Sequence, residues 1–309
     1  MEYIEQEICI LCKQSLLHFD IVYEGKIRAD NDNKCKIVKC IHCSHIQLVG
    51  SRCNLKQHYD DDSQSQDIIN KFNLTIKDII YKEHVEITRR IKYLQISNNK
   101  HYNVLDIGSG YCSFAKKLVN SNINVKITCL EPSVKRTDTG KIYNNINEDE
   151  NNIMIKNIYL DDNFADINNE SFDIVTSWHV LEHLDYIFID KVIQNMYKCC
   201  KKGGKIVIEV PNSEDELFKL DKYKQINYMI HHLSYWNEQT LSLILKQNNI
   251  HNFEIKHVQR YGFKNYLNWI YNLGEKQDCN MNDDLENMDW VEAKKKSKNT
   301  DAILIIIGK

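Results

Sequence analysis

The chain has 309 residues, and 40 lysines and arginines nearly balance 43 aspartates and glutamates, giving a formal net charge of -3. This balance gives no global electrostatic case for nucleic-acid binding, and the length suffices for one large domain and a small one. The acidic N-terminus MEYIEQEIC has no apolar signal segment, and no aliphatic run is long enough for a membrane span. We therefore expect a cytoplasmic protein whose 11 cysteines are metal ligands or buried thiols rather than disulfides.

Two CxxC pairs stand out in residues 1–58: Cys9 with Cys12, and Cys40 with Cys43. Four thiolates at this spacing can close a tetrahedron around Zn²⁺. Short strand-like runs lie between the pairs, so we predict a zinc ribbon that the metal helps to fold. Four cysteines leave no vacant position for water, which favours a structural zinc over a catalytic one. Unrelated reduced cysteines are the alternative, and the rival ligands are Cys35, Cys53, His42 and His45.

Residues 59–100 are predicted to be a linker followed by a helical cap. The stretch 59–66 (YDDDSQSQ) is polar and typical of a solvated linker. Between Asp67 and Leu94, apolar residues recur at helical spacing, which predicts two helices that pack against the next domain. A sharper alternative is that the helices cover a cofactor pocket, with Tyr81 or Arg89 reaching into it.

The stretch Asn103–Ser113 (NVLDIGSGYCS) predicts a buried strand, a glycine turn and the start of a helix. This arrangement presents backbone N–H groups to a nucleoside-like cofactor, and Asp106 could accept a hydrogen bond from it. Glu131 follows the next predicted strand, Val125–Leu130, where an acid can bind both ribose hydroxyls. Ser113 replaces the third glycine of the dinucleotide fingerprint, which weakens the alternative of a nicotinamide cofactor.

Further apolar runs predict the remaining strands of a sheet. They lie at Ile153–Ile158, Phe172–Ser177, Lys205–Val210, Phe253–Val258 and Ala302–Ile307. Strands alternating with helices predict a doubly wound parallel α/β sheet, with binding groups at the carboxyl ends of its strands. An insert at 262–300 separates the last two strands. Its aromatic start, Tyr261–Leu273, predicts a packed helix, a lid or a dimer contact, and Lys294–Lys298 predicts a solvated surface run.

The segments VLDIGSG, LEPS, FDIVTSWHVLEHL and KKGGKIVIEVPN, in this order and spacing, resemble class I S-adenosylmethionine-dependent methyltransferases. The LEH variant and HHLSYWNEQTL at His231–Leu241 resemble the small-molecule branch of that family. The CxxC pairs, with CIHCSHIQL, resemble its zinc-containing members, which include sugar C-methyltransferases and enzymes from surface-polysaccharide clusters. The resemblance implies a seven-stranded Rossmann-like methyltransferase domain over residues 101–309.

The resemblance also implies which residues bind the cofactor. It assigns the methionine end of the cofactor to Asp106, Gly108, Ser109 and Gly110. It assigns the ribose and adenine to Glu131, Pro132 and Ser133 of the LEPS segment, and the floor of the site to Trp178 and His179.

A hydroxyl or carbon acceptor must lose a proton when it is methylated, and histidine suits this role near neutral pH. The candidates are His183, His232, His179 and His231, each of which could instead be structural; the first three are preferred. A divalent metal bound by Glu182 and His183 could instead activate the acceptor, as the resemblance to ubiquinone-pathway O-methyltransferases implies. Those enzymes usually carry a further acid that this sequence lacks, so this alternative stays open. The HxxEH pattern of inverted zinc peptidases is also present, but it directly follows a strand, so we reject a peptidase.

We therefore expect S-adenosylmethionine-dependent methyl transfer to a small-molecule acceptor. The acceptor group is expected to be a hydroxyl of a sugar, or of another nucleotide-activated precursor of a surface polysaccharide. The alternatives are a sugar C-methyltransferase and a non-catalytic zinc-ribbon adaptor. The expected cofactors are S-adenosylmethionine and structural Zn²⁺; no nucleic-acid partner is expected, and a homodimer is left open.

Overall fold

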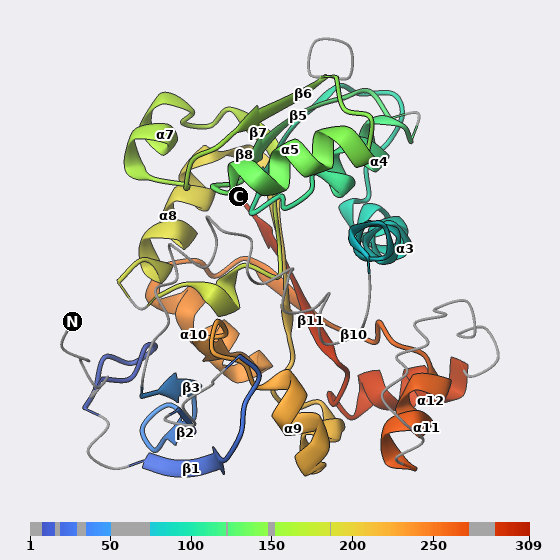
Figure 1. Ribbon diagram of the computed structural model, residues 1–309. Coiled ribbons are helices and arrows are strands. Elements are labelled where there is room, and N and C mark those ends of the chain that lie inside the picture. Colours follow the sequence, from blue (N-terminus) through green and yellow to red (C-terminus); the bar gives the residue numbers. More distant parts are fainter. Residues whose placement is uncertain are drawn as a thin grey trace.

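A seven-stranded sheet in the order β10–β11–β8–β7–β4–β5–β6 forms the centre of the protein (Figure 1). The computed structural model describes residues 8–15, 19–29, 35–50, 75–121, 123–147, 152–185, 187–271 and 288–309. The sheet strands are β4 (Tyr102–Ile107), β5 (Val125–Leu130), β6 (Ile153–Lys156), β7 (Phe172–Trp178), β8 (Cys200–Pro211), β10 (Phe253–Val258) and β11 (Ala302–Gly308). The predicted α/β class and the seven-stranded Rossmann-like sheet are confirmed.

Strand β11 departs from the prediction of an all-parallel sheet. It runs antiparallel to both of its neighbours, and Ile305 lies opposite Ile208 of β8 and Ile255 of β10. The pairs β4–β5, β4–β7, β5–β6 and β7–β8 are parallel. The apolar run AILIII correctly indicated a buried strand, but hydrophobicity carries no information about strand direction.

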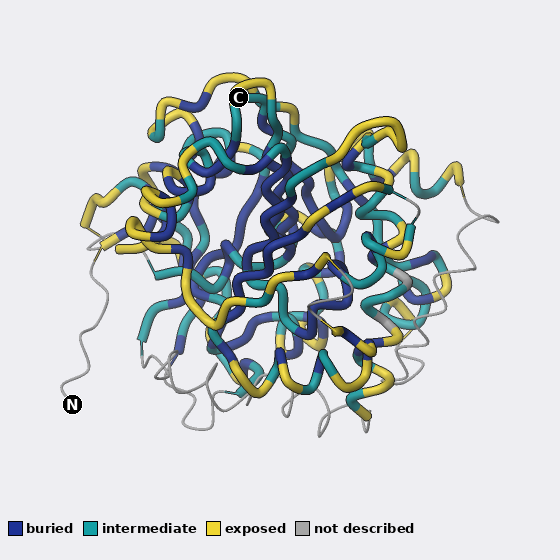
Figure 2. Tube along the Cα trace, turned by 90° about the horizontal axis from the view of Figure 1, so that it is seen from above, coloured by how far each residue is buried: buried dark blue, intermediate teal, exposed yellow. Residues whose placement is uncertain are grey.

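Successive residues of the central strands face opposite layers, as the pleat of a sheet requires. Val104 packs with α3 (Ile76–Leu94) and α4 (Ser113–Val119) on one face. Its neighbour Leu105 packs with α8 (Ile189–Cys199) and α10 (Glu238–Gln247) on the other. Figure 1 shows these helix pairs on either side of the sheet, with α5 (Val134–Tyr143) and α7 (Asp162–Ile167) near the β5–β6 edge. The strands between them form the buried centre (Figure 2).

Helix α3 is the described part of the predicted helical cap. It begins at a capping box, in which the Thr75 side chain accepts from the Asp78 N–H and the Asp78 carboxylate accepts from the Thr75 N–H. Two helices were predicted between Asp67 and Leu94, and the structure describes one, Ile76–Leu94. The predicted linker at 59–66 and the start of the first predicted helix lie outside the described residues.

A second, four-stranded sheet joins the N-terminal segment to a later part of the chain. Its order is β1 (Phe19–Glu24), β2 (Lys36–Cys40), β3 (Ile46–Val49) and β9 (Ser234–Tyr235). Strand β9 belongs to the HHLSYW segment, and it pairs with β3 in antiparallel register. The cysteine-bearing strands therefore do not form their sheet alone.

The C-terminal part before β11 contains α11 (Phe263–Ile270) and α12 (Met288–Lys296), which lie near η2 (Glu216–Lys219) and α9 (Asp221–Asn227). Lys294 of α12 is only 4% exposed, and its ammonium group lies 2.9 Å from Glu216 and 3.5 Å from Asp215. The prediction of a fully solvated lysine run is therefore wrong at Lys294, where α12 turns one lysine toward two carboxylates. Among the described helices, none has the length and apolarity needed to cross a membrane.

Candidate functional site

The glycine turn after β4 has the backbone conformation that only glycine adopts readily. Gly108 and Gly110 have φ values of +66° and +54°. A Cβ on Gly108 would lie 2.5 Å from Cγ2 of Val180, so the segment after β7 packs directly against this turn. A Cβ on Gly110 would meet nothing within 4 Å, so the turn has open space on that side. This open side leaves room for a ligand that needs a close backbone approach, and we call it the glycine cradle.

The structure brings the glycine turn and the LEPS segment together at Glu131. The carboxylate of Glu131 is buried and accepts hydrogen bonds from the N–H groups of Gly110 (2.9 Å) and Ser133 (3.1 Å). A carboxylate has about four lone-pair positions, so two ribose hydroxyls can bind in addition. The Ser133 hydroxyl caps α5 by accepting from the N–H of Arg136, and Pro132 is half-buried between the two.

Asp106 is the next-to-last residue of β4, just before the turn, and is almost fully buried. Its Oδ1 accepts a hydrogen bond from the Thr176 hydroxyl at 2.7 Å, whereas its Oδ2 is buried and has no partner. Burial raises the pKa of Asp106 to about 7, against the opposing effect of the Thr176 hydrogen bond. A buried carboxylate oxygen without a donor calls for a ligand donor, and a cationic amino group fits it.

Helix α3 adds charged groups that the sequence analysis missed. The carboxylate of Glu83 accepts a hydrogen bond from the Ser113 hydroxyl at 2.7 Å. The guanidinium of Arg90 lies 5.1 Å from the ring centroid of Trp178 and 3.1 Å from the carboxylate of Glu209. Both residues lie on α3, whose position relative to the turn depends on tertiary packing that the sequence does not reveal. The charged face of the predicted helix was the only sequence feature that pointed to them.

The two side chains proposed to reach inward from α3 behave differently. Tyr81 is 71% exposed, so that interpretation is wrong for it. Arg89 does point inward, but it pairs with the buried Glu209 at 2.6 Å rather than facing the glycine turn. Burial alone would raise the pKa of Glu209, but the guanidinium groups of Arg90 and Arg89 hold it well below its ordinary value.

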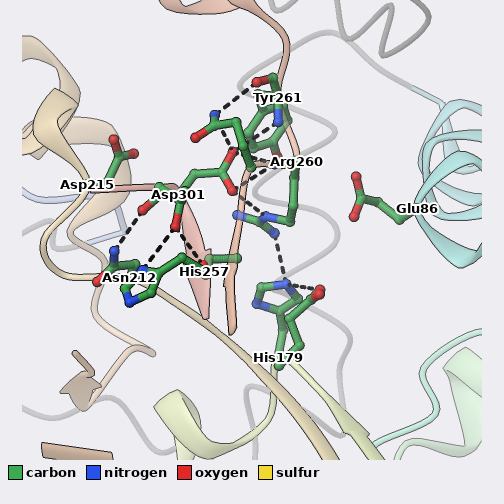
Figure 3. Close-up of polar contacts among 12 residues, drawn as sticks. Glu86, His179, Asn212, Asp215, His257, Arg260, Tyr261 and Asp301 are labelled. Carbon is green, nitrogen blue, oxygen red and sulfur yellow. Dashed lines mark hydrogen bonds and ion pairs between the residues drawn. The ribbon is translucent and has the colours of Figure 1, made fainter. Parts of the chain in front are cut away.

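His179 and Trp178, at the end of β7, are both engaged within the protein. The Nδ1–H of His179 donates to the Glu182 carboxylate at 3.1 Å. The Nε2 atom lies 2.8 Å from Nη1 of Arg260 (Figure 3) and 3.2 Å from a carboxylate oxygen of Glu209. His179 is therefore held by contacts at both of its ring nitrogens, and it orients the carboxylate of Glu182. Trp178 packs on the ring of Phe114 at 5.3 Å, in the layer beneath α4.

Arg260 is fixed by a buried acid, Asp301, which the sequence analysis missed. The Arg260 side chain donates to Asp301 at 3.2 Å, and the backbone N–H groups of Arg260 and Tyr261 donate to the same carboxylate (Figure 3). Burial raises the pKa of Asp301 to about 6, although Arg260 opposes this shift. The hydrogen-bonded chain from Asp301 through Arg260 and His179 ends at Glu182.

A histidine cluster lies next to Glu182, at the end of this series of hydrogen bonds. His183 donates its Nδ1–H to the carbonyl oxygen of His231 at 2.9 Å, and its ring lies 4.6 Å from that of His232. The N–H of Leu233 donates to the Glu182 carbonyl, which fixes the 3-10 helix Leu181–His183 against the HHLSYW segment. The structure therefore brings together His183 and His232, two of the three preferred catalytic histidines, while His179 lies apart on the other side of Glu182.

The charge state of this cluster follows from its burial. Burial lowers the pKa of His183 despite the opposing charge of Glu182, and burial with the neighbouring His183 and His231 holds the pKa of His232 well below its ordinary value. Burial alone would raise the pKa of Glu182, but its contact with His179 holds that pKa below the ordinary value. Two neutral imidazoles thus face an ionised carboxylate.

The four cysteines of the CxxC pairs converge in space, as the spacing predicted. Their Sγ atoms all lie within 4.8 Å of one another, with Cys9 and Cys43 at 3.5 Å and Cys12 and Cys40 at 3.6 Å. Thiolates around a tetrahedral Zn²⁺ lie about 3.8 Å apart, so the residues fit the ion. The rival ligands Cys35, His42 and His45 are not in this group, and Cys53 lies outside the described residues.

Comparison with known proteins gives the family. A family model described as a methyltransferase domain matches residues 81–255, more than half of the chain. Among curated proteins, none matches. A crystal structure of a SAM-dependent methyltransferase from Archaeoglobus fulgidus matches with a TM-score of 0.50 and 17% identity, over 78% of this chain and 98% of that chain. The structure of phosphoethanolamine N-methyltransferase 2 from Haemonchus contortus, in complex with phosphomonomethylethanolamine and S-adenosylhomocysteine, matches with a TM-score of 0.52 and 13% identity. The match covers 87% of this chain and 65% of that chain. At these identities the structural likeness shows the fold alone.

Proposed function

Because the chain belongs to the methyltransferase-domain family and is an S-adenosylmethionine-dependent methyltransferase, we propose that it transfers the methyl group to a hydroxyl of a nucleotide-activated sugar or related precursor. The cofactor would lie on the open side of the glycine turn. Asp106 would receive its amino group, Gly108 and Gly110 would allow the close backbone approach, and Glu131 would bind the ribose hydroxyls. The unpartnered buried oxygen of Asp106 and the open space at Gly110 support this placement.

The observation that carries the acceptor side is the histidine cluster next to the cofactor turn. Val180 packs on Gly108, and three residues later His183 meets His232. Methyl transfer from a sulfonium centre releases a neutral thioether, so the protein mainly aligns donor and acceptor. An alcohol must also lose its proton, and neutral imidazoles are suited to accept it. The cluster of His183 and His232 is therefore the proposed acceptor site, and His179 supports it by orienting Glu182.

Positive charge beside this cluster favours an anionic acceptor. Burial is the main cause of the lowered pKa values of His232 and His183, and the positive charges of Arg28 and Arg136, respectively, add to these shifts. Arginine is well suited to phosphate, because its planar donors can bind two oxygens at once. A diphosphate-linked sugar carries such a group, and the resemblance to enzymes of surface-polysaccharide clusters points in the same direction.

The cysteine quartet is proposed to hold a structural Zn²⁺. All four ligands are thiols, which leaves no open position for a reaction. The described cysteines are all free thiols, which suits a protein of the reducing cytoplasm. The zinc would stabilise the small sheet that β9 completes.

The test is methyl transfer from radiolabelled S-adenosylmethionine to nucleotide-linked sugars and to the same sugars without the nucleotide. The proposal predicts label in the nucleotide-linked sugar, with an O-methyl signal in the NMR spectrum of the product. A C-methyl signal would make the chain a sugar C-methyltransferase. Equal labelling of the free sugar would contradict diphosphate recognition. Tight cofactor binding without turnover on any acceptor would favour the adaptor alternative.

A further inference from the structure

We propose that Glu182, His183 and His232 form a second metal site, which takes a divalent transition cation and activates the acceptor hydroxyl. The metal site stands on its own geometry, whereas its catalytic role rests on the function proposed above. One carboxylate oxygen and one imidazole nitrogen from each histidine all lie within 4.8 Å of one another. Ligand atoms around one cation at about 2.1 Å lie up to about 4.2 Å apart, so a small contraction of the side chains closes the site.

The carboxylate of Glu182 is prepared for a cation. The residue is 1% exposed, and only its Oε1 is engaged, by His179. Its Oε2 is buried and has no hydrogen-bond partner. An ionised oxygen in this state is costly unless a positive group compensates it. No lysine or arginine among the described residues forms an ion pair with Glu182, and a bound cation would supply the missing charge.

His183 presents the nitrogen that a metal requires. The Nδ1–H of His183 donates to the carbonyl oxygen of His231, so the Nε2 of His183 carries the lone pair. This is the outer contact that metal-binding histidines usually make, because it fixes the tautomer and the ring orientation. His179 does the same for the carboxylate by donating to Oε1 of Glu182, and Arg260 holds His179 in turn. The site thus has both ligands and supporting contacts.

The donor set indicates the class of ion. Two imidazole nitrogens and one carboxylate oxygen suit Zn²⁺, Fe²⁺, Co²⁺ or Mn²⁺, whereas Mg²⁺ and Ca²⁺ prefer oxygen ligands alone. Three protein ligands leave at least one position for water or substrate. The cysteine quartet is closed by four thiolates, so the two sites differ in both donor type and vacancy.

A cation here would change how the acceptor loses its proton. A hydroxyl bound to a divalent ion has a strongly lowered pKa, as metal-bound water does. The proton passes to solvent, and the alkoxide oxygen attacks the sulfonium methyl carbon. The new O–C bond forms as the C–S bond breaks, and the electron pair of that bond leaves with the neutral thioether. No oxidant or reductant is involved.

The experiment measures the zinc content of the full chain after equilibration with buffered zinc, in the wild type and in Glu182→Gln, His232→Ala and His251→Ala. His251 is an exposed histidine outside the cluster and serves as the matched control. We expect about two zinc ions per chain in the wild type and in His251→Ala, and about one in the other two variants. A wild type that binds only one zinc would overturn the proposal, as would Glu182→Gln and His232→Ala variants that keep two.

The catalytic role has a separate readout. His232→Ala should bind S-adenosylhomocysteine within about twofold of the wild type but lose turnover on the order of 100-fold. Unchanged turnover in a His232→Ala chain that has lost its second zinc would overturn the activation of the acceptor. If the wild type holds two zinc ions yet methylates no hydroxyl, the proposed function fails while the metal site stands. The zinc content and the turnover therefore report separate failures.

Discussion

Ile46 and Tyr235 are register partners in an antiparallel strand pair that joins the cysteine-bearing segment to the methyltransferase domain. The N-terminal segment also binds the chain just before the histidines. There the N–H of Arg28 donates to the Tyr228 carbonyl, and the N–H of Ile230 donates to the Arg28 carbonyl. The chain that carries His232 is thus held at both ends by the N-terminal segment. We infer that a zinc-bound ribbon fixes the position of the acceptor histidines.

Removal of one zinc ligand should therefore impair methyl transfer more than cofactor binding. In Cys40→Ser we expect loss of the ribbon zinc and a fall in turnover of at least about tenfold, with S-adenosylhomocysteine affinity within about threefold of the wild type. The thiolate-to-cobalt absorption band after cobalt exchange reports the cysteine site specifically. Cys35→Ser is the control, because Cys35 is buried nearby but lies outside the quartet. Full turnover in a zinc-free Cys40→Ser chain would disprove the link.

The glycine cradle can be tested with two substitutions that cause the same backbone strain. Gly110 and Gly203 both have positive φ, and a Cβ on either meets nothing within 4 Å. Alanine at either position should cost about 1–2 kcal/mol of unfolding free energy, measured by urea denaturation. Only Gly110→Ala should also lose S-adenosylhomocysteine affinity, by at least about tenfold, because its methyl group enters the cradle. Equal affinities in the two variants would place the cofactor elsewhere.

Asp106 makes cofactor binding depend on pH. Its pKa is raised from 3.8 to about 7, so between these values the cofactor-free protein retains a proton that the unfolded chain releases. This contribution to stability is present below pH 3.8 and is lost as the pH rises through 7. In the proposed function, the amino group of the cofactor binds the ionised carboxylate. We therefore expect S-adenosylhomocysteine affinity to rise about tenfold from pH 6 to pH 8, with proton release on binding.

The control for this pH dependence is Asp106→Asn, which cannot ionise. Its affinity for S-adenosylhomocysteine should be lower and nearly independent of pH over the same range. Calorimetry in two buffers with different ionisation enthalpies measures the proton released. A wild-type affinity that is flat between pH 6 and pH 8 would contradict the assigned role of Asp106.

The buried pair of Arg260 and Asp301 should contribute strongly to stability. Arg260→Met leaves the Asp301 carboxylate buried without its cation, which should cost about 3–5 kcal/mol of unfolding free energy at pH 8. The loss should shrink at pH 5.5, because the pKa of Asp301 is already about 6 and rises further without Arg260. Urea unfolding at the two pH values measures this difference.

An exposed ion pair provides the comparison for that measurement. Lys295 and Glu292 lie 2.7 Å apart on the surface of α12, and Lys295→Ala should change the unfolding free energy by less than about 0.5 kcal/mol. If the two variants have similar effects, the Arg260–Asp301 pair does not stabilise the fold in the way its burial indicates.

The sequence predicted correctly those features that depend on residues close together in the chain. Apolar runs predicted the sheet strands, the NVLDIGSG stretch predicted the turn, and the CxxC spacing predicted the cysteine quartet. The direction of β11, the pairing of β3 with β9 and the burial of Lys294 were missed, because each depends on a partner distant in the sequence. The contact of His183 with His232 is of the same kind: both residues were predicted, but their proximity follows only from the fold.

The most direct test of the account is a calorimetric titration of S-adenosylhomocysteine into the full chain at pH 8. The account predicts saturable binding at about one site per chain, which Gly110→Ala weakens strongly and Gly203→Ala leaves intact. The absence of measurable binding to the wild-type chain would contradict the assignment of the turn after β4 to this cofactor.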